Sequence, residues 1–330
     1  MKTYVSKIKG YKYLYAYDSI FVAKGKSVQK KKLLGRVDDL ASVSTRKKEF
    51  LELLNQEESI ERTKYWSEKI TNKDFLRYVP IGKIEGLRTS LLRSKLEIGM
   101  IGSDLMEQNF SVDFIFNSNK IEGSKVPFRQ VAKQVKNPSG KVSEEVRNTL
   151  KALHYVDSDF FKFSSKNIVE LHSILMGHEP AKRGLRSEEV VVNNLPVIDW
   201  RVIEEELGAL LVWFTKEKNR MYPPELAFNF YYRFERIHPF VDGNGRTGRL
   251  IMNRILKDNR YHPIILWNKK RIEQMTVFAK RMEGKPEHFY KFMYEQLKKT
   301  YEIYLDKLEK ANEANKLIEK FFIPSEYNYS

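Results

Sequence analysis

A segment of twelve residues in the second half of the chain, His238 to Arg249, gathers residue types that can act on phosphates. The imidazole of His238 titrates near neutral pH and can accept a proton from an attacking hydroxyl. Asp242 can hold Mg²⁺, because in nucleotide sites this ion is bound by one or two carboxylates together with substrate phosphates. The segment therefore predicts a site where a hydroxyl attacks a nucleotide phosphate, with positioning and electrostatics supplying most of the catalysis.

The glycines of the segment precede a predicted helix over residues 246–257, and this arrangement favours an anion. Gly243 and Gly245 lack a Cβ, so the backbone can turn tightly and bring its N–H groups close to a ligand. The unpaired N–H groups and the positive dipole end of the helix attract negative charge. Asn244 can add a side-chain donor, and two arginines three positions apart can grip phosphate oxygens. Each residue alone is more often structural, but the complete set indicates a phosphate site.

The elements that must position this site are predicted to be helices. Breaks are expected at Gly99 and Gly102, and Gly123 is expected to end the helix before it. Apolar residues with helical spacing cover residues 39–55, 60–70, 87–107, 111–122, 127–135, 143–160, 167–176, 200–216, 225–237, 246–257 and 272–320.

Two stretches depart from the helical pattern. Residues 2–36 are rich in aromatic and β-branched residues with a turn signal at residues 24–27, which predicts a three-strand β-meander. Such a sheet is marginally stable alone, so we expect it to pack on the following helices. Residues 177–199 contain glycines, prolines and a short valine run, which predicts a β-hairpin or extended flap. The predicted fold class is mainly α, a helical bundle with a short β-hairpin flap and a small N-terminal β-meander.

Composition sets the wider limits. The chain has 330 residues, of which 42% are hydrophobic and 31% charged, as expected for a folded globular protein. The absence of cysteine excludes disulfides, thiolate metal sites and cysteine nucleophiles. The longest apolar run, residues 209–214, is far shorter than the roughly 20 residues of a membrane-spanning helix. The first residues lack the apolar core of a signal peptide, so we expect a cytoplasmic protein without a membrane partner.

The charge of the chain indicates an anionic partner. Lys and Arg number 59 against 43 Asp and Glu, a formal charge of +16. Such a surface attracts polyanions, and both a nucleotide and a nucleic acid are candidates. The basic residues are spread out, with clusters at residues 30–32, 46–48 and 269–271, so a solvated lysine-rich surface also accounts for the charge.

The segment His238 to Arg249 resembles the signature of the Fic family, HPFx[D/E]GNGRxxR, at every specified position. The resemblance extends over roughly residues 86–300 and includes the stretches 145–148, 171–175 and 183–186. The family has an α-helical fold, and most of its active members transfer AMP from ATP to a Ser, Thr or Tyr hydroxyl of a protein. The resemblance therefore implies a protein adenylyltransferase with ATP as substrate, Mg²⁺ as cofactor and a target protein as partner, the chain itself included.

The resemblance also implies roles for the residues that match the signature. His238 would be the general base, and Asp242 would hold Mg²⁺ between the α- and β-phosphates. Residues 243–245 would form the anion-binding nest, Arg246 would contact phosphates or support the nest, and Arg249 would grip the γ-phosphate. A flap before the motif would hold the target peptide as an added strand. Its residues are Glu188, Glu189, Val190, Val191, Val192 and Asn193.

A second motif lies at residues 118–123 and resembles the inhibitory pattern of the family, [S/T]xxxE[G/N]. It assigns Ser118, Glu122 and Gly123 to an inhibitory helix at about residues 111–123, N-terminal to the core of the domain. Glu122 would pair with Arg249 and take the place of the γ-phosphate, leaving ATP in an unproductive pose. The implied organisation is a β-meander (1–37), a helical linker region (38–85), the Fic catalytic domain (86–300), and a C-terminal helix and tail (301–330).

Several alternatives stay open at this point. The same site could transfer another nucleotide, although kinase-type relatives depart from the GNGR pattern that is intact here. Glu122 could also position a water and support removal of AMP. A nucleic-acid-binding regulator would use the basic surface, but no motif supports it, and residues 301–320 form a single predicted helix with no winged helix. A pure interaction module would leave the motif unexplained, and a homodimer is an open form of assembly.

Overall fold

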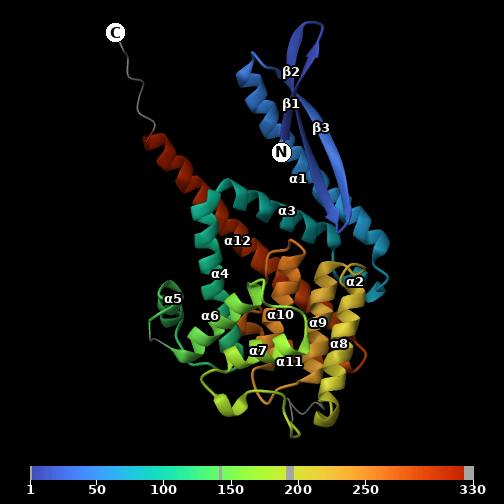
Figure 1. Ribbon diagram of the computed structural model, residues 1–330, viewed down its shortest axis with the longest axis vertical. Helices are drawn as coiled ribbons and strands as arrows, with labels where there is room; N and C mark the ends of the chain where they lie inside the picture. Colours follow the sequence, from blue (N-terminus) through green and yellow to red (C-terminus); the bar gives the residue numbers. More distant parts are fainter. Residues whose placement is uncertain (1, 141–142, 191–196, 323–330) are drawn as a thin grey trace.

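The computed structural model describes residues 2–140, 143–190 and 197–322, which form twelve α-helices and one small sheet (Figure 1). The strands are β1 (Lys2–Ile8), β2 (Tyr11–Ala23) and β3 (Lys26–Arg36). The helices are α1 (Leu40–Lys69), α2 (Lys73–Tyr78), α3 (Ile81–Glu97), α4 (Gly99–Ile121), α5 (Phe128–Lys136), α6 (Glu144–Asp157), α7 (Ser165–Leu175), α8 (Ile203–Glu217), α9 (Pro223–Ile237), α10 (Asn244–Asp258), α11 (Arg271–Met282) and α12 (Pro286–Phe322). Three 3₁₀ turns complete them, η1 (Pro180–Lys182), η2 (Trp200–Val202) and η3 (Asn268–Lys270).

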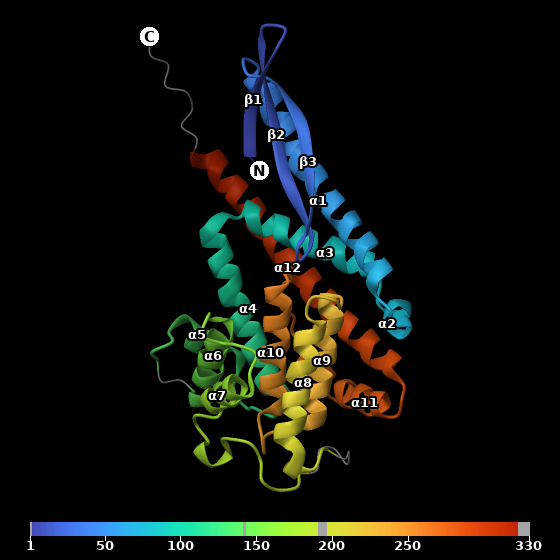
Figure 2. The same ribbon diagram turned by 45° about the vertical axis from the view of Figure 1, so that its right-hand side comes forward.

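The N-terminal sheet is an antiparallel meander in the order β1-β2-β3, as predicted. Side chains alternate across its two faces. On one face Ala16, Ile20 and Leu34 are buried and pack with Phe50 and Leu54 of α1. Figures 1 and 2 show α1 running along this sheet, at the end of the molecule away from α7 and α11. The expectation that the meander needs a helix to complete its core is confirmed.

The helices differ from the sequence pattern in two places. α1 is one helix of 30 residues, where two helices over 39–55 and 60–70 were expected. Residues 56–59 contain no glycine or proline, so nothing interrupts the backbone hydrogen bonds between the two apolar stretches. The break expected at Gly99 is present, with φ +69°, but Gly102 lies inside α4. The predicted short helix 111–122 is therefore the second half of a 23-residue helix that begins at Gly99.

The segment 177–199 is less regular than the predicted hairpin. Its described residues, 177–190 and 197–199, contain the turn η1 and no β-strand, and residues 191–196 lie outside the described part of the chain. The flap residues Val191, Val192 and Asn193 fall in that gap. The helix after the motif begins at Asn244, two residues earlier than predicted.

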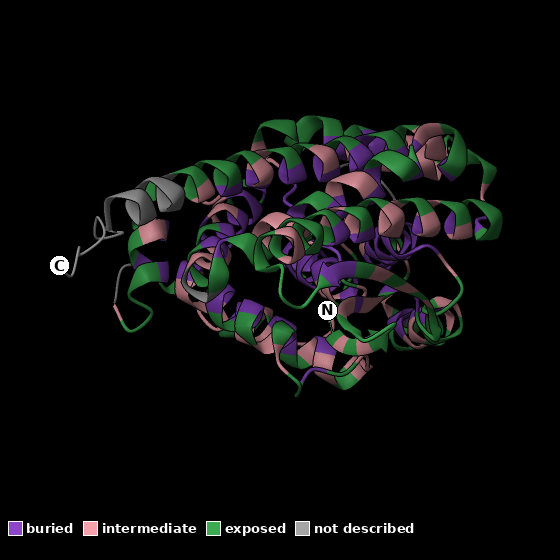
Figure 3. Ribbon diagram, turned by 90° about the horizontal axis from the view of Figure 1, so that it is seen from above, coloured by how far each residue is buried: buried purple, intermediate pink, exposed green. Residues whose placement is uncertain are grey.

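One apolar core connects the motif helices with the N-terminal helices. α9 is buried along nearly its whole length and packs against α8 and α10 (Figure 2). The buried cluster extends from Trp66 and Phe75 to Leu308, so the segment predicted as a linker, 38–85, contributes to the same core. In the view from above, buried residues line the inner sides of the helices and exposed residues their outer sides (Figure 3). No helix of the described residues combines the length and apolar character needed to cross a membrane.

A buried ionic cluster joins the sheet to the helical core. Glu85 of α3 is fully buried, and its Oε2 accepts hydrogen bonds from Arg62 Nε (2.6 Å) and Arg88 Nε (2.9 Å). Burial opposes the charged form, but the two guanidinium groups hold the pKa of Glu85 below its usual value. Arg62 Nη1 also donates to the Val22 carbonyl of β2 (2.6 Å), and Tyr222 OH donates to Glu85 Oε1 (3.0 Å).

Replacing Glu85 with glutamine is expected to lower the free energy of unfolding by about 3–5 kcal/mol, because two buried guanidinium charges lose their counter-ion. Urea unfolding followed by circular dichroism measures the change. Glu97→Gln is the matched control, since the Glu97–Arg93 pair is exposed and is expected to contribute at most about 1 kcal/mol. An equal loss of unfolding free energy in the two variants would show that the buried cluster contributes no more to stability than an exposed ion pair.

Candidate functional site

The motif loop between α9 and α10 is fixed by two left-handed residues and one amide side chain. His238 (φ 49°) ends α9, and Gly243 (φ +76°) precedes α10. Asn244 Oδ1 accepts from the Phe240 backbone N–H (3.0 Å), and its Nδ2 donates to the Phe240 carbonyl (2.7 Å). The side chain of Asn244, which the sequence suggested as a donor to a ligand, therefore closes the loop instead. A left-handed histidine is costly, so the loop must be held by its surroundings.

His238 is held in the form that can accept a proton. Burial lowers the pKa of its imidazole, although the Glu235 carbonyl and nearby carboxylates oppose this, so the ring is neutral near pH 7. Its Nδ1 lies 3.3 Å from the Glu235 carbonyl, which can only accept, so Nδ1 carries the proton and Nε2 has the free lone pair. His238 lines a small cavity together with Asp242 and the first turn of α10.

That cavity has a volume of about 150 Å³ and lies at the N-terminus of α10. The first turn of the helix, Asn244 and Gly245, faces it, and backbone N–H groups at a helix start have no partner within the helix. Such a position attracts a phosphate. Arg249, one turn further along, contributes a guanidinium that is almost fully buried.

Arg249 is fully engaged by the second motif. Its Nη2 donates to Glu122 Oε1 (2.7 Å) and to the Ser118 carbonyl (3.0 Å), and its Nε donates to Ser118 Oγ (3.0 Å). Its Nη1 lies 3.5 Å from Tyr231 OH. The structure thus brings Glu122 to Arg249 across 127 positions of sequence. Gly123 (φ +95°) terminates α4, so the carboxylate of Glu122 projects from the helix end toward α10.

Glu122 fills the space that the missing side chain of Gly245 leaves. A methyl group at position 245 would overlap Glu122 Oε1 and crowd Arg249 Nη1. The carboxylate therefore lies directly against the first turn of α10, where a phosphate group would be attracted. The two sequence motifs form one site, with Glu122 in the position of an anion.

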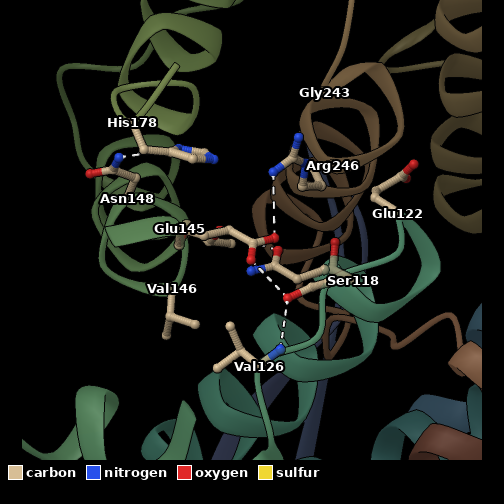
Figure 4. Close-up of polar contacts among 12 residues, drawn as sticks. Ser118, Glu122, Val126, Glu145, Val146, Asn148, His178, Gly243 and Arg246 are labelled. Carbon is tan, nitrogen blue, oxygen red and sulfur yellow. Dashed lines mark hydrogen bonds and ion pairs between the residues drawn. The ribbon is translucent and has the colours of Figure 1, made fainter. Parts of the chain in front are cut away.

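Arg246 points away from the cavity and supports the loop. Its guanidinium lies 3.4 Å from Asp242 Oδ1 and 3.8 Å from Glu145 Oε1 of α6. Glu145 Oε2 in turn accepts from Ser124 Oγ (2.7 Å), two residues beyond Glu122. Figure 4 shows Glu145 between Arg246 and the chain that leaves α4. Of the two roles that the resemblance allows Arg246, this geometry favours support of the nest.

Asp242 stands at the mouth of the cavity. Its Oδ1 accepts from the Gly243 N–H (2.5 Å), and its Oδ2 accepts from Lys182 Nζ (3.1 Å). Burial would raise its pKa, but Arg246 and Lys182 outweigh burial and lower it, so the carboxylate is ionised near pH 7. Just over a third of its side chain is exposed, which leaves it open to a cation.

Several residues at the site carry no signal in the motifs. Glu235 and Arg271 line the cavity, and Lys182 pairs with Asp242. His172 Nε2 lies 2.9 Å from the Asp242 carbonyl, and its ring stacks on Phe240 with 3.6 Å between centroids. Burial lowers the pKa of His172 to about 4, so the ring is neutral and donates this hydrogen bond. The sequence stretch around His172 agreed with the family, but nothing in it assigned this contact.

Arg186 connects the start of the flap to the motif loop. This buried side chain donates from Nε to the His238 carbonyl (2.8 Å) and from Nη1 to the Glu188 carbonyl (3.0 Å). Its Nη2 donates to the Ile198 carbonyl on the far side of the gap. Glu188 and Glu189 are exposed and Val190 is half-buried. Arg186 therefore connects Glu188 and Ile198 to the motif loop beside His238.

The pH dependence of stability provides a test of the buried carboxyl groups. Burial raises the pKa of Glu235 to about 8, with Glu122 adding to it, and burial raises the pKa of Glu225 to about 7. Between about pH 4.5 and these values the folded protein binds protons that the unfolded chain has released. Below about pH 7 the lowered pKa values of the buried His172 and His238 act in the opposite direction, so the free energy of unfolding is expected to fall as the pH rises from about 7 to 8.

Urea unfolding at several pH values in this range measures that slope. Glu235→Gln removes one of the two groups and is expected to flatten the slope between about pH 7 and 8. Glu273→Gln, an exposed carboxylate of α11, should leave it unchanged. A stability that rises with pH over this range would contradict the assignment.

The fold and the site together define a mainly helical protein with a polar cavity at the N-terminus of α10. Residues 162–256 match the family model described as Fic/DOC family. The chain is 30% identical over 204 residues to a protein named Protein adenylyltransferase Fic from Nematostella vectensis, and 29% identical over 206 residues to its namesake from Drosophila mojavensis. These matches cover 58% of this chain and 48% and 40% of the relatives, so the chain spans less than half of their length.

Solved structures agree on the fold. A Fic-domain-containing signaling protein from Bacteroides thetaiotaomicron superposes with a TM-score of 0.58 at 20% identity, covering 68% of this chain and 98% of that one. Fic-1 from C. elegans gives a TM-score of 0.56 at 21% identity, covering 83% and 87%. The family model and the named relatives agree with the resemblance found in the sequence, and the solved structures confirm the predicted fold class.

Proposed function

We propose that the protein is an adenylyltransferase that transfers AMP from Mg-ATP to a Ser, Thr or Tyr hydroxyl of a target protein. The observation that carries the proposal is the convergence of His238, the start of α10 and Arg249 on one cavity. A neutral imidazole next to a helix N-terminus supplies a base beside a phosphate site. The name shared by the curated relatives, protein adenylyltransferase, supports the same reaction.

The reaction needs one proton transfer and one displacement at phosphorus. The hydroxyl oxygen of the target attacks the α-phosphorus of ATP while its proton passes to His238 Nε2. The bond between the α-phosphorus and the bridging oxygen breaks, and pyrophosphate leaves with the electron pair. The products are an AMP ester of the target and pyrophosphate. The N–H groups of the first turn of α10 would hold the phosphate oxygens, and Arg249 would hold the γ-phosphate.

The residues present fit a magnesium ion at Asp242. This carboxylate is ionised, partly exposed and adjacent to the phosphate position, and one carboxylate with substrate phosphates is a usual Mg²⁺ site. Among the described residues no cluster of three or more His, Asp or Glu could bind a metal without the substrate. When bound there, Mg²⁺ would neutralise charge on the phosphates. Lys182 and Arg246 hold the carboxylate in position for it.

We also propose that Glu122 holds the enzyme in an inactive state. Its carboxylate pairs with Arg249 and lies against Gly245, so the γ-phosphate and Glu122 compete for one position. With Glu122 in place the cavity measures about 150 Å³. Sites for small molecules usually measure about 300–1,000 Å³, so release of Glu122 is needed for a productive nucleotide pose.

The target would bind across the flap, from Glu188 onward, as an added strand beside His238. Arg186 anchors that segment and so positions the target hydroxyl relative to the imidazole. An experiment must identify the target protein, and the chain itself is the first candidate to test.

Intact-mass and peptide mass spectrometry of the Glu122→Gly variant tests the function. The variant is incubated with Mg²⁺ and each nucleoside triphosphate in turn, and AMP addition with ATP alone is expected. Addition of another nucleotide would show that a nucleoside triphosphate other than ATP is the donor. Release of AMP from a modified target, without addition, would favour the reverse reaction. If neither the chain nor any protein in a cell extract were modified, the proposal would be overturned.

A further inference from the structure

The face of the N-terminal sheet that does not pack on α1 carries tyrosines and lysines. Tyr4 and Tyr15 lie opposite each other on β1 and β2 and stack with 5.3 Å between ring centroids. Tyr17 contacts Tyr4 from the neighbouring pair (6.0 Å). Lys31 of β3 lies over both Tyr4 (4.8 Å) and Tyr15 (4.7 Å), and the register places Lys2 beside Tyr17. We call this surface the open face, defined by Lys2, Tyr4, Tyr13, Tyr15, Tyr17 and Lys31.

The sheet carries many more basic than acidic residues. Residues 2–36 contain nine lysines and one arginine against a single acidic residue, Asp18. On the side facing α1, Lys30 pairs with Glu57 (3.0 Å) and Lys32 with Glu49 (3.2 Å). On the open face Lys31 is exposed and pairs with no carboxylate in the described part of the chain. Two lysines of the α1 side are thus neutralised by carboxylates of α1, whereas Lys31 of the open face is not.

The arrangement of the rings decides which polyanion fits. Single-stranded nucleic acids bind by stacking bases on free aromatic faces. Here Tyr4 and Tyr15 stack on each other and Lys31 covers both, so these faces are already occupied. What the surface offers is ammonium groups and phenolic hydroxyls, which donate to phosphate oxygens and to base edges.

The dimensions of the sheet agree with a duplex. Three strands spaced about 4.8 Å apart are roughly 10 Å wide between their outer axes. The major groove of B-DNA is about 12 Å wide and admits a two-stranded β-ribbon, so two neighbouring strands of this sheet could enter it at a time. The turn residues Lys9 and Lys24 lie at opposite ends of the sheet, where they would reach the flanking phosphates. Figures 1 and 2 show the sheet projecting from the helical body, so a long rod could approach it.

From these observations we propose that the open face is a docking surface for double-stranded DNA, entered through the major groove. This binding is independent of the AMP transfer proposed above, because the open face and the motif loop lie at opposite parts of the molecule (Figure 1). The surface would place the enzyme on DNA, with α1 and the buried cluster around Glu85 joining the sheet to the helical core.

Fluorescence anisotropy with a labelled duplex of about 20 base pairs, two helical turns, tests the proposal on the full chain. The variant Lys2→Glu/Lys31→Glu is compared with Lys216→Glu/Lys218→Glu, which makes the same charge change at exposed lysines at the end of α8. The open-face variant is expected to bind at least about 10-fold more weakly and to lose about 1.8 from the slope of log K against log salt. The α8 variant should bind as wild type does.

Other outcomes would overturn the proposal. These are no duplex binding by wild type at about 0.1 M salt, equal weakening in both double variants, and tighter binding of single-stranded DNA or duplex RNA than of duplex DNA. Circular dichroism verifies that the variants are folded. Lys31→Gln removes the charge without reversing it and should also bind duplex DNA more weakly than wild type. Self-modification measured in a Glu122→Gly background should be equal in both double variants, so failure of DNA binding and failure of AMP transfer are read separately.

Discussion

Replacing Glu122 with glycine is expected to raise the rate of AMP transfer about 10- to 100-fold. The charge-assisted hydrogen bond from Arg249 Nη2 to Glu122 Oε1 (2.7 Å) is of a kind worth about 1.5–3 kcal/mol, and the γ-phosphate must replace it. Glycine removes the carboxylate and leaves Arg249 free to bind the nucleotide. The measurement is incorporation of labelled AMP into the chain itself and into proteins of an extract.

Two controls separate release of inhibition from loosening of α4. Asp104→Gly makes the same kind of change at an exposed acid of the same helix and is expected to leave transfer at the wild-type rate. Glu122→Gln keeps the volume and removes the charge, so it should activate to an intermediate level. If Glu122→Gly were no more active than wild type with Mg-ATP, the assignment of Glu122 as the inhibitory group would be wrong.

His238→Ala is expected to lower transfer about 10²- to 10⁴-fold, the usual contribution of a positioned general base. The loss is best measured in the Glu122→Gly background, where the starting rate is high. His154→Ala, at an exposed position of α6, is the matched control and should have no effect. Incorporation equal to that of the parent would exclude His238 as the base, provided that circular dichroism shows the same helix content.

The pH profile of the same enzyme gives an independent measurement on His238. Because burial lowers the pKa of this imidazole, the ring is already neutral through the range where a free histidine titrates. Transfer should therefore be flat around pH 7 and decline only at more acidic pH than the usual value of about 6.5. A decline centred at or above that value would mean that His238 is more exposed to solvent than the structure shows.

Features carried by one continuous segment could be predicted from the sequence, whereas contacts between distant segments could not. His238 to Arg249 is a continuous segment, so its glycines, carboxylate and arginines reveal a phosphate site without knowledge of the fold. The partnership of Glu122 with Arg249 came only from the family resemblance, since no local pattern connects residues 127 positions apart. The continuity of α1 was missed because the apolar spacing lapses at residues 56–59, although nothing there breaks a helix.

The supporting residues of the site could not be predicted for the same reason. Lys182, Arg186 and His172 reach the motif loop from segments 50 to 70 positions away, and each acts through a backbone carbonyl or a neighbouring carboxylate of the loop. Asn244 shows the converse limit. Its place inside the motif suggests a ligand donor, but its two hydrogen bonds to Phe240 are visible only once the turn is built.

The space beside Gly245 also determines how mutation can change this enzyme. On the proposal that Glu122 takes the place of the γ-phosphate, a side chain at position 245 large enough to displace Glu122 would also block the phosphate. Substitutions of Gly245 are therefore expected to silence the proposed activity without releasing it. Mutations that set it permanently active are expected at Ser118, Glu122 or the residues that orient them. Hyperactive and dead alleles should thus map to separate stretches of the gene, which a saturation library would reveal directly.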